Sequence, residues 1–580
     1  MSGISRTVAG LGSRISLCIA ACAALGACAS RANVDASANV PARYTNVWIT
    51  VNELWINARA TAGPDDTDWL KFPLRSPVTV NLAATTNGTL TLLATQLHVP
   101  AGDYGQLRLY LAEASAQLTS SAQSASISFN DEVDYVDGNG NSQQVPLRLA
   151  NPEKGIGIPM TLKVPTSASA ILSAIGSKNS TNTTTATATT TTTTTTATPP
   201  ALATAVIDFD AARDLVPVLI SGQAGFFLNP HLTAIDLAHA ATIQGQVDVT
   251  AIAADAITGR REVEVSAETL SSDGTRHVIV KSAPVRSDGS FALYPFSAAS
   301  GEPTTYDLVF HGPLVQTVIV KSVPLTSGTP TSAATGSLGT IVLTAATSFP
   351  VNVLPSSPIA VRGARVCFYQ TPNGSGEVPY LIEERAADPF SGLFASDQAL
   401  STGAIAVGTF VSNQTPVLTT VTPVEGAAAY AIATSAASFD DANLGETVKA
   451  PTPISSNPTL FTAPLPTVPA TASADSVAVT VNVASPGRYD RGALIITRDG
   501  AIVTATSLDT ALEQNQPSVN LSLADVPGGS ATASFAAGVY YAEVWVWSSS
   551  DPTGTLSRQP YSAAIDLSTG SASGITIDIT

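Results

Sequence analysis

The chain has 580 residues, which is too long for one hydrophobic core and predicts about four domains. Charged residues make up 12% of the chain, against roughly 25% in an average soluble protein. Such a composition, rich in Thr, Ser and Ala, suits an exported β-protein. The formal net charge of −17 includes no basic block, which excludes nucleic acid as a partner.

The first 28 residues have the features of an export signal. Arg6 and Arg14 give a weakly basic start, and the apolar run 15–25 is too short to span a bilayer as a helix. The run ends in Leu25-Gly26-Ala27-Cys28, which resembles the lipobox of bacterial lipoprotein precursors. The resemblance implies cleavage of residues 1–27 as a signal peptide and lipidation of Cys28.

Several acyl chains, palmitate among them, would then hold the mature protein on a membrane. Ala29 follows the cysteine, and by resemblance to enterobacterial sorting rules a residue other than Asp at this place favours the outer membrane. The alternative is an ordinary secretory signal that is cut elsewhere, with Cys28 a chance residue.

Alternation of apolar and polar residues with a period of two predicts an all-β protein. The pattern is clearest at 107–111, 477–483, 544–547 and 575–579. A Gly shortly before a Tyr also recurs four times along the chain, at Tyr104, Tyr306, Tyr430 and Tyr540. The predicted fold is therefore a series of tandem antiparallel β-sandwich modules behind a cleaved lipoprotein signal peptide.

Composition divides the mature chain into a tether and four modules. Residues 28–43 are small and polar and predict a flexible, lipidated tether. The modules follow at 44–239, 240–348, 349–468 and 469–580. A Thr-rich tract at about 177–200 predicts a disordered insertion within the first of them.

Motifs in the first two modules resemble known families. VWITVNEL at 47–54, VPAGDYGQLRL at 99–109, and IDFDAAR at 207–213 with FLNP at 227–230 resemble the bacterial domain-of-unknown-function family 4382. That resemblance implies a β domain behind a lipoprotein signal, without an assigned activity. IQGQV at 243–247 and RSDGSFAL at 286–293 are similar to the transthyretin-like or carboxypeptidase-regulatory β-sandwich, which implies a spacer or binding unit.

The sequence carries no recognised catalytic motif, so we predict that the protein is not an enzyme. Its five His residues show no metal-ligand spacing, and it lacks a serine-hydrolase elbow and a phosphate-binding loop. The neighbours Glu383 and Glu384 would point to opposite faces of a strand, and we interpret them as solvated charges. Cys367 stands alone among β-forming residues and is interpreted as a small buried apolar group.

One oxygen-rich loop could hold Ca²⁺. Its candidate metal ligands are Asp134, Asp137, Asn139 and Asn141, with Asp131 close by in the sequence. The helical calcium-loop pattern is not met, because Ser142 and Arg148 stand where a Gly and a bidentate Glu belong. An Asx-Gly hairpin turn explains the same residues without a metal, so no cofactor is required.

An aromatic row near the C-terminus is the second candidate site. Tyr541, Trp545 and Trp547 alternate along one predicted strand and share a face. Exposed, the row could stack on sugar rings as a ligand-binding surface. The alternative is that the row is core, with Val544 and Val546 facing outward against another module.

We therefore expect a non-enzymatic, lipid-anchored protein of the outer membrane that faces the periplasm or the cell surface. It would extend from the bilayer as an adhesion, scaffold or ligand-binding stalk, with the membrane and other envelope components as partners. The alternative is a carbohydrate-binding lipoprotein of a polysaccharide utilisation or export system.

Overall fold

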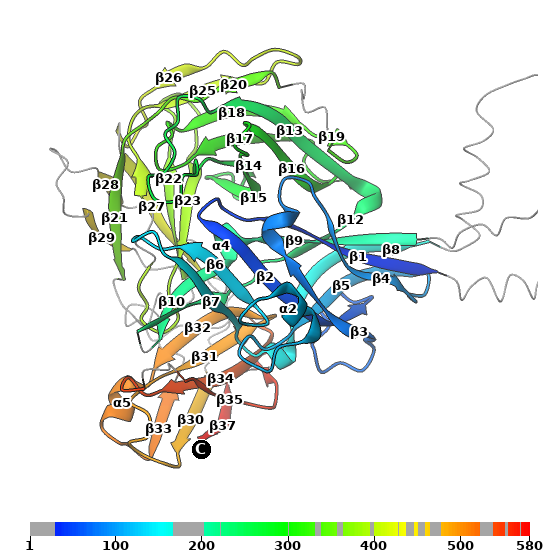
Figure 1. Cartoon of the computed structure of the whole chain (residues 1–580), viewed down its shortest axis with the longest axis vertical. Helices are drawn as coiled ribbons and strands as arrows, with labels where there is room; N and C mark the ends of the chain where they lie inside the picture. Colours follow the sequence, from blue (N-terminus) through cyan, green and yellow to red (C-terminus); the bar gives the residue numbers. More distant parts are fainter. Residues whose placement is uncertain are drawn as a thin grey trace, which may run out of the picture.

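The structure, a computed structural model, describes residues 30–165, 202–220, 222–299, 301–330, 338–355, 364–394, 399–426, 429–436, 446–449, 459–463, 477–522, 537–551, 555–568 and 570–580. Regular structure in these ranges is almost entirely strand (Figure 1). The α-helices are short: α2 (Ser120–Ala125), α4 (Ala211–Asp214) and α5 (Asp509–Glu513). The all-β prediction is confirmed. Over the same ranges no helix is long and apolar enough to cross a membrane.

The N-terminal domain is one twelve-stranded sheet in the order β10-β11-β7-β6-β2-β5-β8-β12-β9-β1-β4, with β3 beside β2. The sheet encloses one hydrophobic cluster to which nearly all of its strands contribute. Its strands are β1 (Arg31–Asn39), β2 (Tyr44–Asn57), β3 (Leu70–Asn81), β4 (Thr91–Leu97), β5 (Gly102–Leu111), β6 (Glu132–Val136), β7 (Ser142–Leu149), β8 (Ile156–Val164), β9 (Leu202–Asp210), β10 (Leu215–Ile220), β11 (Gln223–Leu228) and β12 (Thr233–Asp236).

The prediction of a flexible tether at 28–43 is wrong where the structure describes it. Residues 31–39 form β1, which runs parallel to β9 and antiparallel to β4. Ala32, Val34 and Ala36 are fully buried. Small side chains suggested a tether because they carry little hydrophobic signal, yet they fit well where a strand lies between two neighbours and packs closely on the core.

Two smaller sheets form the second domain and enclose their own cluster. One holds β13 (Ala240–Asp248), β16 (Ser290–Ser297), β19 (Thr326–Ser327) and β20 (Thr340–Val342). The other has the order β15-β14-β17-β18-β25-β26, made of β14 (Glu264–Leu270), β15 (His277–Pro284), β17 (Thr305–His311), β18 (Val318–Pro324), β25 (Ile405–Thr409) and β26 (Thr419–Val421).

The predicted third module contributes two strands to a sheet of the second domain. Strands β25 and β26 fall within the predicted third module, yet β25 pairs in parallel with β18 of the second domain. The third domain's own sheets are β24-β21-β29 and β23-β22-β27-β28. Their bounds are β21 (Ser348–Pro355), β22 (Ala364–Gln370), β23 (Tyr380–Ala386), β24 (Ala399–Ser401), β27 (Ala429–Ala436), β28 (Glu446–Lys449) and β29 (Thr459–Ala463).

The C-terminal domain is a two-sheet sandwich around a fourth cluster. One sheet holds β30 (Val477–Val483), β33 (Ser518–Ser522) and β37 (Ala572–Ile579). The other holds β31 (Arg491–Arg498), β32 (Ala501–Ser507), β34 (Val539–Trp547), β35 (Ser557–Pro560) and β36 (Ile565–Asp566). The alternation predicted at 477–483 is the pattern of β30, where Val477, Val479 and Val481 are buried and Ala478 is exposed.

The recurring Gly and Tyr pairs each serve a different core. Tyr104, Tyr306, Tyr430 and Tyr540 lie on strands, are buried, and belong to four separate hydrophobic clusters. The hydroxyl of Tyr104 donates to the carbonyl of Pro100, and that of Tyr430 donates to the carbonyl of Ser401. In these two tyrosines a packed ring is therefore combined with a hydroxyl that is hydrogen-bonded to the backbone.

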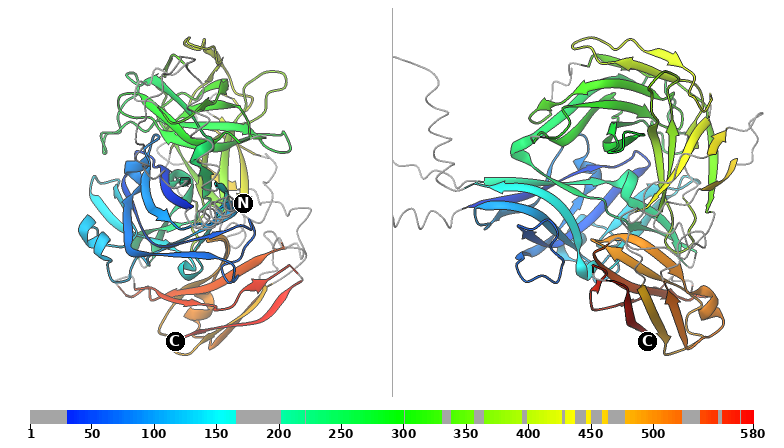
Figure 2. Two further views of the ribbon diagram at one scale, coloured as in Figure 1. Left: turned by 90° about the vertical axis from the view of Figure 1, so that its right-hand side faces the viewer. Right: turned by 180° about the vertical axis from the view of Figure 1, so that it is seen from behind.

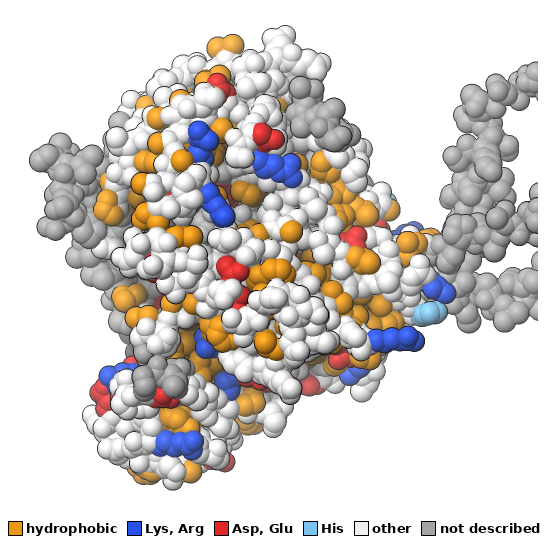
Figure 3. Space-filling view, viewed as in Figure 1, with side chains coloured by type: hydrophobic (Ala, Val, Ile, Leu, Met, Phe, Trp, Pro, Cys, Tyr) orange, Lys and Arg blue, Asp and Glu red, His pale blue; other side chains and the backbone are white. Residues whose placement is uncertain are grey.

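The domains are not strung out as a stalk. The N-terminal domain, blue to cyan, lies between the green and yellow domains on one side and the orange and red C-terminal domain on the other (Figures 1 and 2). The C-terminal domain contacts the N-terminal one directly, through the ion pair between Arg108 and Asp499 and the hydrogen bond from Ile502 N to Asn229 Oδ1. The visible face is mostly uncharged, with charged side chains scattered singly or in small groups (Figure 3).

Candidate functional site

The loop proposed for calcium is a β-hairpin turn between β6 and β7. The carboxylate of Asp137 accepts from the backbone N–H groups of Asn139 and Asn141 and from the side-chain amide of Gln143. These hydrogen bonds, the one from Asn141 above all, lower the pKa of Asp137. The carboxylate of Asp134 accepts instead from Asn46 on β2.

The geometry therefore fits the Asx-Gly turn, which is the alternative that needs no metal. In the part of the chain that the structure describes, no group of three or more His, Cys, Asp or Glu side chains could hold a metal ion.

The aromatic row is buried, so its interpretation as an exposed sugar platform is corrected. Trp545 and Trp547 are 3% and 6% exposed, and Tyr541 is 4% exposed. The Trp545 ring lies edge-on to Phe227 of the N-terminal domain, with ring centroids 5.1 Å apart. The Trp547 ring makes the same kind of contact with Phe390 of the third domain at 5.2 Å.

The Trp545 and Trp547 rings belong to an interdomain apolar cluster drawn from three domains, and Tyr541 is not a member of it. Val544 and Val546 point the other way, into the core of the C-terminal sandwich, so both faces of β34 are covered. The members of the interdomain apolar cluster are Ala150, Val216, Val218, Ile220, Phe227, Phe390, Ala493, Ile495, Ile502, Ala505, Trp545 and Trp547.

The two cysteines singled out in the sequence have different outcomes. Cys28, the predicted lipidation site, lies outside the described residues. Cys367 is on β22 and is 4% exposed, which confirms that it packs as a buried group.

A set of mostly buried ionisable groups lies where the N-terminal and third domains meet, and we call it the charge junction. Residues around α4 supply its N-terminal half, and strands β22 and β23 supply the other half. The charge junction consists of Asp210, Arg213, Asp214, His231, Arg365 and Glu384.

The members of the charge junction are paired across the domain boundary. Arg213 Nε lies 3.2 Å from Glu384 Oε1. Arg365 reaches in the opposite direction, with a terminal nitrogen 3.7 Å from Asp214 Oδ1 and 2.7 Å from His231 Nδ1. His231 Nδ1 is also 3.2 Å from Asp214 Oδ1. Each domain therefore contributes one cation and one carboxylate, and each of these groups is paired with the opposite charge of the other domain.

Burial shifts the protonation of these groups. Burial and the charge of Asp214 raise the pKa of Asp210 to about 6. Burial, with the charge of Glu384, raises the pKa of Asp214 to about 6. The pKa of His231 is lowered by burial and by the charges of Arg365 and Arg213. A neutral imidazole can accept at Nδ1, which fits the short contact with Arg365. The pKa of Glu384 is lowered because Arg213 and Arg365 outweigh its burial.

The second domain contacts this region at Asn39, the last residue of β1 in the N-terminal domain. Asn39 Nδ2 lies 2.9 Å from Asp210 Oδ1, 2.6 Å from Glu264 Oε1 and 2.7 Å from Ser282 Oγ. Ser282 Oγ donates to the other oxygen of Asp210 at 2.9 Å. Lys281 makes a neighbouring ion pair with Asp208 at 2.5 Å. Three domains thus share one network of polar contacts.

A cavity of about 90 Å³ lies within this network, lined by residues that include Asp210, Glu264, His311 and Glu384. It has room for a few water molecules. Small-molecule sites usually have volumes of roughly 300–1,000 Å³, so the arrangement serves to connect domains rather than to enclose a substrate. The sequence interpretation of Glu384 as a solvated charge is wrong, because its side chain is 14% exposed and paired with Arg213.

A further polar contact joins the second and third domains. Glu268 on β14 is 1% exposed, and its carboxyl accepts from the N–H of Leu381 on β23 and from the hydroxyl of Ser266. Burial raises the pKa of Glu268 to about 8. Burial therefore favours the protonated form of this acid, which bridges the two domains.

Sequence reasoning missed the charge junction because its members are far apart in the chain. Asp208 and Asp210 stood in a motif that indicated a family but no role. The available signal was a charge-dense stretch, Asp208 to Asp214, in a chain with few charges. Acidic residues in such a stretch are expected to pair with a basic residue, but the sequence does not show that Arg365 is the partner of Asp214.

Comparison of the chain with curated proteins finds no match. A family model does match the part of the chain that forms the N-terminal domain. The match begins within β1, ends just after β11, and includes Asp210, Arg213 and Asp214 of the charge junction. Residues 32–230 are a domain of the family described as Domain of unknown function (DUF4382).

Proposed function

We propose that this protein is a non-catalytic, lipid-anchored scaffold or ligand-binding protein of the bacterial cell envelope, held at the outer membrane through Cys28. In this proposal its four domains act as one rigid unit that presents surfaces and grooves at a fixed distance from the bilayer.

The charge junction is the observation that carries the scaffold function. Its carboxylates and guanidinium groups form ion pairs with each other across a domain boundary, so they are not available to bind a substrate. Breaking a buried pair of this kind costs about 3–5 kcal/mol, because a charge is left without its partner. Separation of the domains would break several such contacts at once, which supports a rigid arrangement.

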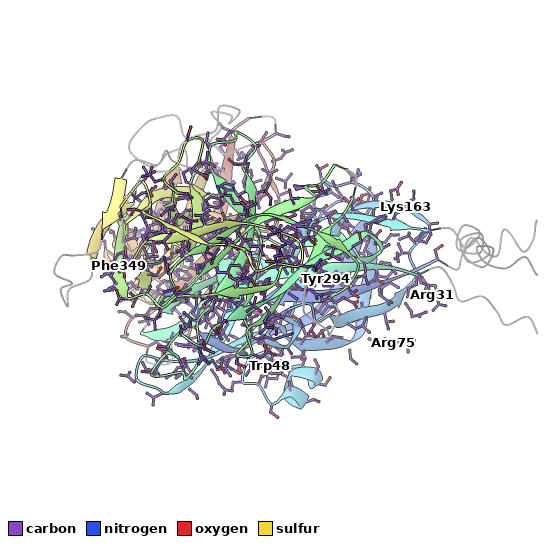
Figure 4. All side chains as sticks on the ribbon, turned by 90° about the horizontal axis from the view of Figure 1, so that it is seen from above. Arg31, Trp48, Arg75, Lys163, Tyr294 and Phe349 are labelled. Carbon is purple, nitrogen blue, oxygen red and sulfur yellow. The ribbon has the colours of Figure 1, made fainter. Side chains whose placement is uncertain are left out.

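The start of the fold supports an anchor at Cys28. Strand β1 begins at Arg31, and three extended residues span about 11 Å at most. A lipidated Cys28 would therefore place the end of the N-terminal domain directly against the bilayer. Arg31 and Lys163 both lie at this end, opposite Phe349 (Figure 4). Lys or Arg side chains near an anionic surface contribute about 1 kcal/mol each.

Replacement of Cys28 tests the anchor. In cells that express Cys28→Ser, we expect the protein to leave the membrane pellet and to lose the acyl mass seen on its N-terminal peptide. A full-length product without acyl mass that still pellets with membranes would overturn the proposal.

Cys22→Ser is the matched control. Cys22 lies in the signal peptide that the proposal removes, so its mature product is identical to the unaltered one and stays acylated. Loss of acylation in both variants would point to failed export instead of a lost lipidation site.

One finer proposal concerns the second domain. The two-sheet second domain acts as a transthyretin-like spacer or binding unit, as the motifs at 243–247 and 286–293 imply. Its two facing sheets around one cluster support that proposal. A polysaccharide partner finds less support, because the aromatic row that suggested one is buried.

A further inference from the structure

A groove of about 840 Å³ runs between the N-terminal and C-terminal domains. Strands β7 and β11 form one wall, and β34 and β35 form the other. The volume falls within the range of small-molecule sites. The groove borders the interdomain apolar cluster, since Ile220 and Trp545 belong to both.

Arg148 on β7 projects into this groove. Leu147 and Leu149 on either side of it belong to the core of the N-terminal domain, so Arg148 faces the C-terminal domain. It stands opposite Phe227 in the register of β7 with β11. Its guanidinium lies over Gly225, where an added Cβ would come within 2.8 Å of a terminal nitrogen of Arg148. The absence of a side chain at 225 makes room for the guanidinium.

The guanidinium of Arg148 has no hydrogen-bond or ion-pair partner among the described residues. Arg558, on the other wall of the same groove, contrasts with it because it pairs with Glu543 at 2.6 Å and with Glu153 at 3.2 Å. Burial without a compensating anion lowers the pKa of Arg148 to about 10. One wall of the groove thus presents a partly buried positive charge that no residue in the described ranges pairs with.

A partly desolvated, unpaired guanidinium is costly, and an oxyanion relieves that cost with two parallel charge-assisted hydrogen bonds. We propose that Arg148 is the anchor of a binding site for the carboxylate or phosphate group of a small organic molecule. The groove is far larger than an inorganic ion needs, so the remainder of the ligand would lie along its polar wall near Gln144 and Ser557. This site goes beyond the proposed scaffold function and does not depend on the lipid anchor.

Protection from arginine modification tests the site in the full-length protein in detergent. Phenylglyoxal attacks the neutral form of a guanidine, so Arg148 should react faster than the paired Arg558, as read by peptide mass spectrometry. Inorganic phosphate and citrate, each at millimolar concentration, are the two probes. We expect at least one of them to slow modification of Arg148 several-fold and to leave exposed Arg75 unchanged.

Protection by phosphate alone assigns a phosphorylated ligand, protection by citrate alone assigns a carboxylate ligand, and equal protection supports the shared oxyanion chemistry. If neither probe protects Arg148, or if both protect Arg75 to the same extent, the proposal is overturned.

Two variants separate binding from folding. Arg148→Gln should lower the affinity for the effective probe about tenfold or more in calorimetry, because a charge-assisted hydrogen bond is lost. Arg75→Gln makes the same change of charge at the periphery of the N-terminal domain (Figure 4) and should bind as before. Gly225→Ala keeps the charge but displaces the guanidinium, and we expect weaker binding with an unchanged melting temperature. Equal affinity in Arg148→Gln and the unaltered protein would refute the site.

Discussion

Replacement of Trp545 by Ala separates the two interpretations of the aromatic row. The ring is 3% exposed, contacts Phe227 and Phe390 with centroids 5.1 and 6.5 Å away, and lies 5.1 Å from the Arg558 guanidinium. Burial of about 200 Å² at about 25 cal/mol per Å² contributes about 5 kcal/mol. Truncation of a buried Trp to Ala costs about 3–5 kcal/mol in practice.

This loss should fall on domain docking, because the ring packs on other domains and not in its own sandwich. Hydrogen exchange followed by mass spectrometry should show faster exchange in β10 and β11 of Trp545→Ala, with β30 and β37 still protected. Val546→Ala is the matched control on the same strand. Val546 faces the C-terminal core, so that variant should speed exchange in β30 and β37 instead.

Unchanged exchange in β10 and β11 of Trp545→Ala, together with loss of binding to a glycan array, would refute this reasoning. The row would then be the exposed sugar platform that was one of the two interpretations from the sequence.

Three other substitutions test the remaining contacts. The pKa of Glu268 is about 8 in the fold and about 4.3 in an unfolded chain, so its contribution to stability is complete below pH 4 and falls by about 5 kcal/mol as the pH rises to 8. Glu268→Gln should flatten this dependence in urea unfolding, and parallel pH profiles of the two proteins would contradict it. Arg365→Met should lower the free energy of unfolding by about 3–5 kcal/mol, because it leaves the buried carboxylate of Asp214 without a partner. The control Arg75→Met, at an exposed position, should change the free energy of unfolding by less than about 0.5 kcal/mol. Equal losses in the two variants would count against the charge junction. Val34→Asp buries a carboxylate and should lower the free energy of unfolding by about 3 kcal/mol. The control Asn33→Asp keeps the acceptor for the Gln96 N–H and should leave the free energy of unfolding nearly unchanged. An unchanged unfolding midpoint in Val34→Asp would restore the tether interpretation.

Period-two alternation predicted individual strands well. The segment 477–483 coincides with β30, and 107–111, 544–547 and 575–579 lie within β5, β34 and β37. Alternation shows which side chains share a face of a strand, because that depends only on the order of residues in the strand. It does not show which face is buried, because burial also depends on the domain that packs against the strand. The sequence therefore placed Trp545 and Trp547 on one face correctly but left open what lies against them.

Charge was harder to predict than strand. Glu384 looked like a solvated group, since an ionisable side chain is seldom buried unless it has a partner. The partner of Glu384 is Arg213, which is more than a hundred residues away in the chain. The family motif at 207–213 contains half of that contact, and only the docking of the third domain completes it.

The interdomain contacts also decide whether the groove beside Arg148 exists in solution. Domains of one chain move relative to each other by default unless their interface is large and apolar. Here the interdomain apolar cluster borders the groove, and the pair between Arg108 and Asp499 adds a second contact between the same two domains. The groove is therefore preformed, which spares a ligand the cost of ordering its walls. It follows that Trp545→Ala, which removes an apolar ring between the two walls of the groove and keeps both guanidinium groups, should weaken protection of Arg148 by phosphate or citrate. Val34→Asp, on a strand that does not line the groove, should act through stability alone.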